Sequence, residues 1–127
     1  MRVSQGQLLA LLEANVIELR FHRRNPKTGW NDMRRMLITN DRQILNSAPG
    51  RIALHFNPPT HAPAYNWRTR NLACGWDLFF QEYRMVPIES CDVVTIIPTR
   101  PVEKFWNYFN LYLQAMSPQE KIEFMQK

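Results

Sequence analysis

The chain has 127 residues, of which 45% are hydrophobic and 12% aromatic, and its 16 Lys and Arg outnumber its 11 Asp and Glu. A chain of this length favours one domain over residues 1–127, because half of it would hardly build a stable core. Its apolar runs are far shorter than the roughly 20 residues that cross a bilayer, which excludes an integral membrane protein. The start lacks a secretory signal and the cysteines are too few for a disulfide scaffold, so we expect a cytosolic protein with reduced thiols.

The first elements predicted by the sequence are a short helix and a strand. Ser4 and Gln7 have the spacing of a capping box and precede four leucines, which indicates a helix over residues 5–14. Apolar and polar residues then alternate over residues 17–23, which predicts a half-buried strand. Its polar face begins at Glu18 and is largely basic, so we expect this face to contact water.

Turns and short strands are predicted in the middle of the chain. Turn-forming residues at 25–29 predict a reversal into a second strand over 33–39, and a short loop is expected within 40–50. Alternation returns over residues 51–56 and predicts another strand. Three prolines at 57–64 exclude a central strand or a helix interior, so a long loop is expected there.

The remaining sequence predicts strands and then helices. Strands are expected over 71–77, 83–86 and 92–98, with a helical turn at 87–90. Ser117 is expected to cap a last short helix. A longer helix before it has an apolar stripe at helical spacing, made of Val102, Phe105, Trp106, Phe109, Leu113 and Met116.

Taken in chain order, these elements indicate a mainly β protein with flanking helices. Short strands joined by tight turns, with helices only at the ends, are typical of a small barrel or a strongly bent sheet. We therefore expect an N-terminal helix over 5–14, a small barrel over 16–98 and a C-terminal helical segment over 101–127.

The positive charge is concentrated in one part of the chain. Residues 19–70 carry ten bases and two acids, and nine of those bases are arginine, whereas residues 101–127 are neutral. Arginine binds phosphate in bidentate fashion and stacks on bases, so this bias favours an anionic partner, above all nucleic acid. A well-solvated basic surface is the alternative.

The best candidate site is the basic hairpin of the first two strands. Strand alternation places Arg20 and His22 on one face, and the returning strand could bring Arg34 and Arg35 beside them. The candidate nucleic-acid-binding residues of this hairpin are Arg20, His22, Arg23, Arg24, Lys27, Arg34 and Arg35. Crowded arginines repel each other unless an anion or an acid neutralises them. The acids that could do so within the protein are Glu18, Asp32 and Glu82.

Aromatic residues lie beside bases in two predicted loops. Single-stranded nucleic acid is bound by such combinations, because bases stack on the rings while guanidinium groups hold phosphates. The additional candidate binding residues are Trp30, Tyr65, Trp67, Arg68 and Arg70. Alternatively, Trp67 folds back and closes the open end of the barrel.

The sequence carries no motif typical of catalysis or of cofactor binding. Its three histidines form no metal-ligating pair, its acids are scattered, and it has no glycine-rich phosphate loop. We therefore expect a protein that is not an enzyme and that binds no metal and no cofactor.

The apolar stripe of the C-terminal helices is expected to pack mostly on the barrel. A small barrel has limited surface for these helices, so part of the stripe could contact a second copy or a host protein. The candidate partner-binding residues are Trp106 and Phe124.

Several short segments between residues 16 and 98 resemble one family. They are VIELRF at 16–21, RRMLITN at 34–40, WDL at 76–78, EYRMVPIE at 82–89 and DVV at 92–94. These segments are similar to the WYL-type, Sm-like SH3 β-barrel family of small proteins carried by tailed bacteriophages. The chain departs from that pattern at 83–86, where one arginine of the strand is missing, and in its longer proline-rich loop.

The resemblance implies a five-stranded Sm-like or SH3-like barrel that is encoded by a phage and acts in the cytoplasm of the infected bacterial host. Such barrels often bind RNA, DNA or nucleotide-like ligands. We therefore expect a non-enzymatic barrel that binds single-stranded RNA or DNA with modest sequence preference. Two alternatives remain: a module that binds and modulates a bacterial host factor through the C-terminal helices, and a sensor whose arginines hold a nucleotide-like anion.

Overall fold

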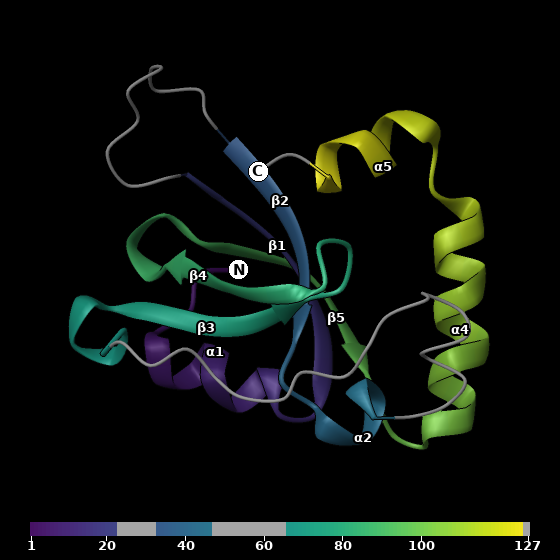
Figure 1. The fold of residues 1–127 in the computed structure, drawn as a ribbon, viewed down its shortest axis with the longest axis horizontal. Helices are drawn as coiled ribbons and strands as arrows, with labels where there is room; N and C mark the ends of the chain where they lie inside the picture. The colour runs from purple at the N-terminus through teal and green to yellow at the C-terminus, as the bar shows by residue number, and fades with distance from the viewer. Residues whose placement is uncertain (23–32, 47–65, 126–127) are drawn as a thin grey trace.

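A five-stranded antiparallel sheet forms the centre of the protein. The computed structural model describes residues 1–22, 33–46 and 66–125. The strands are β1 (Asn15–His22), β2 (Met33–Thr39), β3 (Leu72–Asp77), β4 (Glu82–Pro87) and β5 (Asp92–Pro98). Their order across the sheet is β4-β3-β2-β1-β5, so β2 is central and β4 and β5 are the edges (Figure 1).

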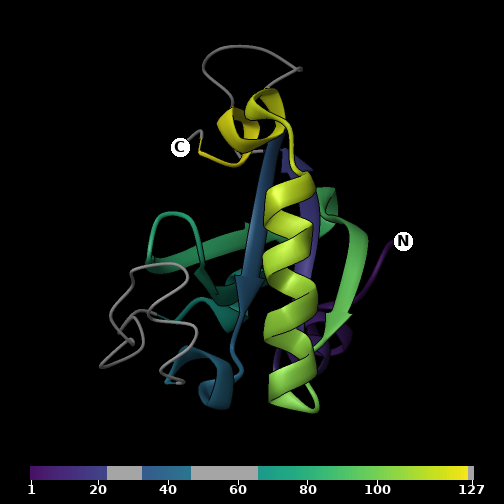
Figure 2. The ribbon, with the colours of Figure 1, turned by 90° about the vertical axis from the view of Figure 1, so that its right-hand side faces the viewer.

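Helices flank the sheet on both faces. They are α1 (Gln5–Leu12), α2 (Arg42–Leu45), α4 (Val102–Ala115) and α5 (Pro118–Phe124), with single-turn 3₁₀ helices η1 (Arg68–Arg70) and η2 (Ile88–Ser90). The long helix α4 runs along one face of the sheet, and α1 lies against the other (Figure 2). Within the described ranges, every helix is too short or too polar to span a membrane.

Most of these elements match the bounds that the sequence predicts. The strands over 33–39 and 92–98 are confirmed, and Ser4 and Ser117 form the capping boxes of α1 and α5. Helix α1 ends at Leu12, two residues earlier than predicted. The predicted turn at 25–29, strand at 51–56 and loop at 57–64 lie outside the described residues.

The loop predicted within 40–50 contains the short helix α2 instead. Asp41 caps this helix by accepting a hydrogen bond from Gln43 N at 2.9 Å. The same carboxylate accepts hydrogen bonds from Thr99 Oγ1 at 2.5 Å and from Arg100 Nη1 at 2.7 Å. Because these contacts come from the distant connection between β5 and α4, the local sequence gives little sign of the helix.

The sheet bends sharply between its two halves, but the described strands do not close into a barrel. In the described pairing, β2 meets β3 through Ile38 and Thr39 alone, whereas every residue of β3 pairs with β4. Gly75 permits this close crossing, because a Cβ atom there would lie 2.6 Å from Ile38 Cδ1. The mainly β fold with flanking helices is therefore confirmed, and the closed barrel over 16–98 is not.

Apolar side chains form a core on each face of the sheet. Alternation in β1 directs Ile17 and Leu19 toward α1, where they pack with Leu8 and Leu12. The core on the opposite face includes Val16, Leu37, Ile44, Leu45, Trp76, Phe105, Trp106, Phe109 and Phe124. The sheet is thus the middle layer of three.

Burial on both faces corrects the prediction that the polar face of β1 contacts water. Glu18 is only 5% exposed, because α4 and α5 pack over this part of the strand. Arg20 and His22, nearer the end of β1, are exposed as predicted. The surface available for binding is therefore the end of the hairpin rather than its whole face.

The structure also corrects the assignment of Trp106 and Phe124 as partner-binding residues. Trp106 is 4% exposed and Phe124 is fully buried, so both side chains belong to the core between the helices and the sheet. The large apolar side chains that this part of the chain does expose are Tyr108 and Leu111 on α4, Ile122 on α5 and Met125 directly after it.

Replacing Phe109 with Ala tests the core under α4. Phe109 is fully buried, and its ring stacks on those of Phe105 and Tyr112 at centroid distances of 5.2 and 5.9 Å. The cavity should lower the free energy of unfolding by about 3–5 kcal/mol. The control is Leu111→Ala, at a position that is 64% exposed, which should cost less than about 0.5 kcal/mol. Equal losses in chemical denaturation would contradict the packing of α4.

Candidate functional site

Basic side chains gather where β1 ends. Arg20 and His22 are exposed there and, together with Arg2 and Ser90, line a pocket of about 270 Å³, which we call the β1-end pocket. Its other lining residues are Phe21, Met33 and Asp92. The lining residues come from the N-terminal segment, from the β1–β2 hairpin and from the region of η2.

Hydrogen bonds to the turn η2 fix the shape of this pocket. Ser90 Oγ accepts a hydrogen bond from His22 N at 3.2 Å and donates one to the His22 carbonyl at 2.7 Å. The guanidinium of Arg2 donates to the carbonyl oxygens of Glu89 at 2.5 Å and Cys91 at 3.1 Å. Since a guanidinium has five N–H donors, Arg2 is held in place with donors to spare.

The pocket keeps a net positive charge although it contains an acid. The N-terminal ammonium lies 2.6 Å from Asp92 Oδ1, and this hydrogen bond lowers the pKa of the Asp92 carboxyl. The carboxylate therefore already has a cation beside it, and Arg2 and Arg20 add two further positive charges. An anion is the ligand that this arrangement favours.

A second basic group lies on η1 and adjoins η2. The Arg68 guanidinium lies over the Trp67 ring, 5.0 Å from its centroid, and both Arg68 and Arg70 are exposed. Ile88 N donates a hydrogen bond to the Asn71 carbonyl at 3.2 Å, which joins the end of η1 to η2. Both turns lie at the same end of the sheet (Figure 1). The structure therefore brings two separately predicted basic groups toward one turn.

Gln5 fixes the position of η1 against the start of α1. Its side-chain amide donates to the Arg68 carbonyl at 2.9 Å and to the Leu72 carbonyl at 2.7 Å. The sequence alone does not identify Gln5 or Arg2 as candidate binding residues. Both act through contacts with residues more than 60 positions away, and no local pattern signals such contacts.

Arg35 is not part of this surface. It pairs with Arg20 across β1 and β2, but it lies 3.0 Å from Glu18 Oε2 and 2.5 Å from Glu123 Oε2, over the ring of Phe124. Burial opposes its charge, but the hydrogen bonds to the two carboxylates outweigh this effect and raise the pKa of Arg35. The structure therefore shows that acids within the protein, Glu18 among them, neutralise the charge of Arg35.

The buried cluster around Glu18 joins the sheet to the C-terminal helices. Glu18 accepts hydrogen bonds from Tyr112 Oη at 2.6 Å and from Thr95 Oγ1 at 3.4 Å, besides its ion pair with Arg35. Burial and the contact with this carboxylate raise the pKa of Tyr112. The cluster holds α4 over the sheet, and its Glu18 carboxylate helps to neutralise the charge of Arg35.

The other predicted binding residues are placed as follows. Arg34 pairs with Phe21 across the hairpin, and its side chain is half-buried, on the face opposite to Arg35. Arg34 and Arg35 therefore do not extend the surface of Arg20 and His22. The candidate residues Arg23, Arg24, Lys27, Trp30 and Tyr65 lie outside the described residues.

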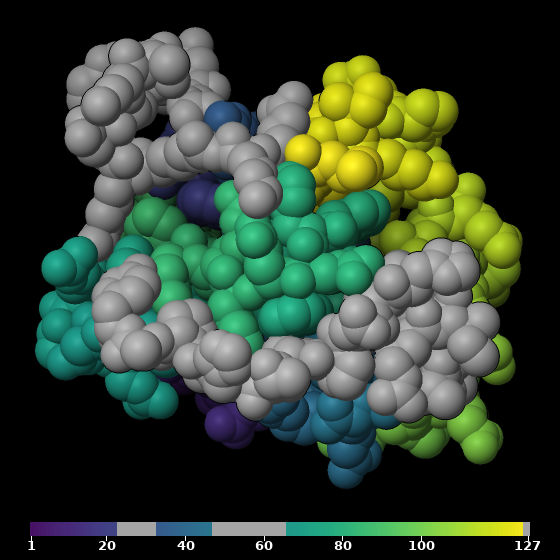
Figure 3. Space-filling view, viewed as in Figure 1, coloured from purple at the N-terminus to yellow at the C-terminus, as the bar shows by residue number. Residues whose placement is uncertain are grey.

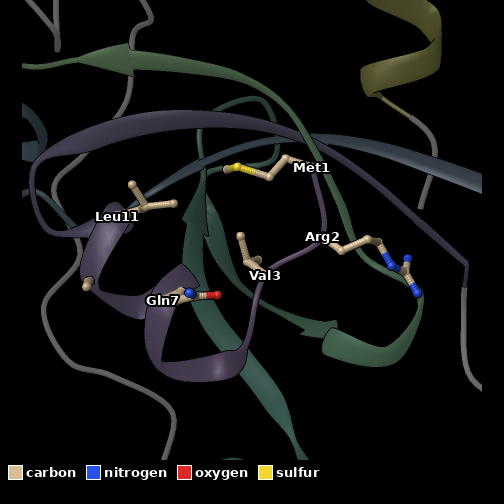
Figure 4. Close-up of a pocket in the computed structure, with 6 residues that line it drawn as sticks. Met1, Arg2, Val3, Gln7 and Leu11 are labelled. Atoms are coloured by element: carbon tan, nitrogen blue, oxygen red, sulfur yellow. The ribbon is translucent and has the colours of Figure 1, made fainter.

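A second hollow, of about 450 Å³, lies between the N-terminal segment and α1 (Figure 4). Met1, Val3 and Leu11 give it an apolar lining, while Arg2 extends away from it toward η2. The Gln7 side chain is occupied by the capping box of α1. This hollow therefore offers little polar chemistry, and the β1-end pocket is the stronger candidate.

In the part of the chain that the structure describes, no three His, Cys, Asp or Glu residues lie close enough to hold a metal ion. Comparison with known proteins adds no assignment. No family model matches the chain, and no curated protein or solved structure matches it either.

Replacing Arg35 with Met tests the role assigned to the cluster around Glu18. The change leaves a buried carboxylate without its cation and should lower the free energy of unfolding by about 3–5 kcal/mol. Arg20→Met is the matched control, because Arg20 is the register partner of Arg35 but is exposed, and it should cost less than about 0.5 kcal/mol. If chemical denaturation gives the two variants the same stability, Arg35 does not hold the helices in place.

Proposed function

We propose that the protein binds single-stranded nucleic acid, RNA or DNA, through the surface around η2. This surface consists of Arg2, Arg20 and His22 of the β1-end pocket together with Trp67 and Arg68. The observation that carries this proposal is the convergence of Arg2, Arg20 and His22 on one pocket, whose turn η2 also adjoins the stacked pair of Trp67 and Arg68. Phosphate-binding cations and a stacking ring are the two components that single-stranded nucleic acid requires.

The two basic groups serve different parts of the ligand. Arg2 and Arg20 line a pocket suited to a phosphate, while the Trp67 ring with Arg68 over it offers a platform beside which a base can stack. Contacts of this kind act on the backbone and on the faces of bases. They give affinity with modest sequence preference, because every nucleotide carries a phosphate and a π-face.

The fold supports a related proposal about origin. The five strands and the helical turn η2 directly before β5 agree with what the resemblance to the Sm-like barrels of tailed phages implies. We therefore propose that the chain belongs with that group and is a barrel-derived, non-enzymatic protein that acts in the cytoplasm of the infected bacterium.

A module that binds a bacterial host factor is the second candidate function. It is favoured by the exposed apolar side chains of the C-terminal helical segment, namely Tyr108 and Leu111 on α4, Ile122 on α5 and Met125 directly after it. In the space-filling view, the C-terminal helices stand at the side of the molecule opposite to η1 (Figure 3). The two candidate functions therefore use separate surfaces and can be tested separately.

The salt dependence of binding tests the nucleic-acid proposal. Affinity for a single-stranded oligonucleotide should fall steeply with salt, because each phosphate contact releases counterions. The double variant Arg20→Gln/Arg68→Gln should lower the slope of log affinity against log salt by about 1.4, since each contact to a single strand contributes about 0.7. Fluorescence anisotropy across a salt series measures this slope.

The control for that experiment removes a charge elsewhere. Lys121→Gln on α5 eliminates one exposed positive charge away from η2 and should leave the slope within error of the parent. An absence of binding at low salt would sink the nucleic-acid proposal, and an equal loss of slope in both variants would show that η2 is not the contact surface.

A further inference from the structure

We propose that the β1-end pocket binds the terminal phosphomonoester of a nucleic-acid strand. This inference rests on the proposed function and makes it more specific: one end of the strand enters the pocket, and the adjoining nucleotides run toward η1. The same chemistry occurs at a 5′-phosphate and at a 3′-phosphate, and the experiment below distinguishes these two sources.

The charge of the pocket matches a phosphomonoester better than a phosphodiester. Arg2 and Arg20 line the pocket, and its one carboxylate, that of Asp92, already accepts a hydrogen bond from the Met1 nitrogen, so two guanidinium groups are left for a ligand before any contribution from His22. A phosphodiester within a strand carries a single negative charge. A terminal phosphomonoester carries about −1.5 to −2 at neutral pH and so neutralises the pocket more completely.

The shape of the pocket also favours the end of a strand. Its lining comes from three chain segments, represented by Arg2, by Arg20 with Met33, and by Ser90. A volume of about 270 Å³ between these segments accommodates a phosphate with part of its sugar. The exposed arginines of η1 lie outside this lining, where the continuing backbone would pass.

The side chain of one donor, Arg2, and the strand that carries the other, Arg20, are held in place before any ligand arrives. Arg2 is fixed by the carbonyls of Glu89 and Cys91, and the end of β1 that carries Arg20 is fixed by the two hydrogen bonds between Ser90 and His22. Donors that are already ordered lose little conformational entropy on binding. A multiply charged phosphate therefore gains the most from this arrangement, because it accepts from several of them at once.

The test compares one short single-stranded oligonucleotide in three forms: with a 5′-phosphate, with a 3′-phosphate, and with hydroxyl groups at both ends. We expect one phosphorylated form to bind about tenfold more tightly than the hydroxyl form at low salt. The form that gains affinity identifies which end enters the pocket. Inorganic phosphate should remove the advantage of that form.

Two variants locate the preference in the molecule. Arg20→Gln should reduce the ratio of affinities to about one. Arg68→Gln, outside the pocket, should weaken all three oligonucleotides by the same factor and leave the ratio unchanged. Circular dichroism confirms that each variant is folded before the ratio is measured.

The outcomes separate this inference from the proposed function. If all three forms bind equally, the inference is overturned while the proposed function stands. If none of them binds, both are overturned. A preference that persists in Arg20→Gln would show that the phosphate binds elsewhere and would also overturn the inference.

Discussion

The arrangement of the protein depends on one buried carboxylate in the sheet. Glu18 is 5% exposed, and such a group is costly unless it is paired and hydrogen-bonded. Arg35 supplies the charge from β2, Thr95 a hydroxyl from β5, and Tyr112 a hydroxyl from α4. These partners come together only when α4 lies over the sheet, so the cluster fixes the C-terminal helices to one face.

This constraint also determines which arginines remain for binding. Arg20 and Arg35 are partners in register on neighbouring strands, but Arg35 is enclosed between Glu18, Glu123 and the ring of Phe124. Arg20 is exposed and contributes to the β1-end pocket instead. Of these two arginines of the hairpin, Arg35 therefore stabilises the fold, whereas Arg20 is exposed and belongs to the surface around η2.

Local patterns in the sequence predicted the parts of the fold that depend on neighbouring residues. The capping boxes at Ser4 and Ser117 and the strand over 92–98 are found where the patterns place them. Contacts between distant segments were not predictable in the same way. The burial of Glu18 depends on α4, and the role of Arg2 depends on carbonyls almost 90 residues away. One sign was available: Val16, which alternation places on the same face of the strand as Glu18, is apolar.

An NMR titration with a single-stranded oligonucleotide tests most directly whether the surface around η2 is where this protein binds its ligand. Backbone amide shifts report contact residue by residue without any substitution. The account predicts shifts over residues 20–22, 67–71 and 88–92, with α4 and α5 unchanged. Shifts concentrated over residues 102–124, with none around η2, would contradict it and move the binding surface to the C-terminal helices.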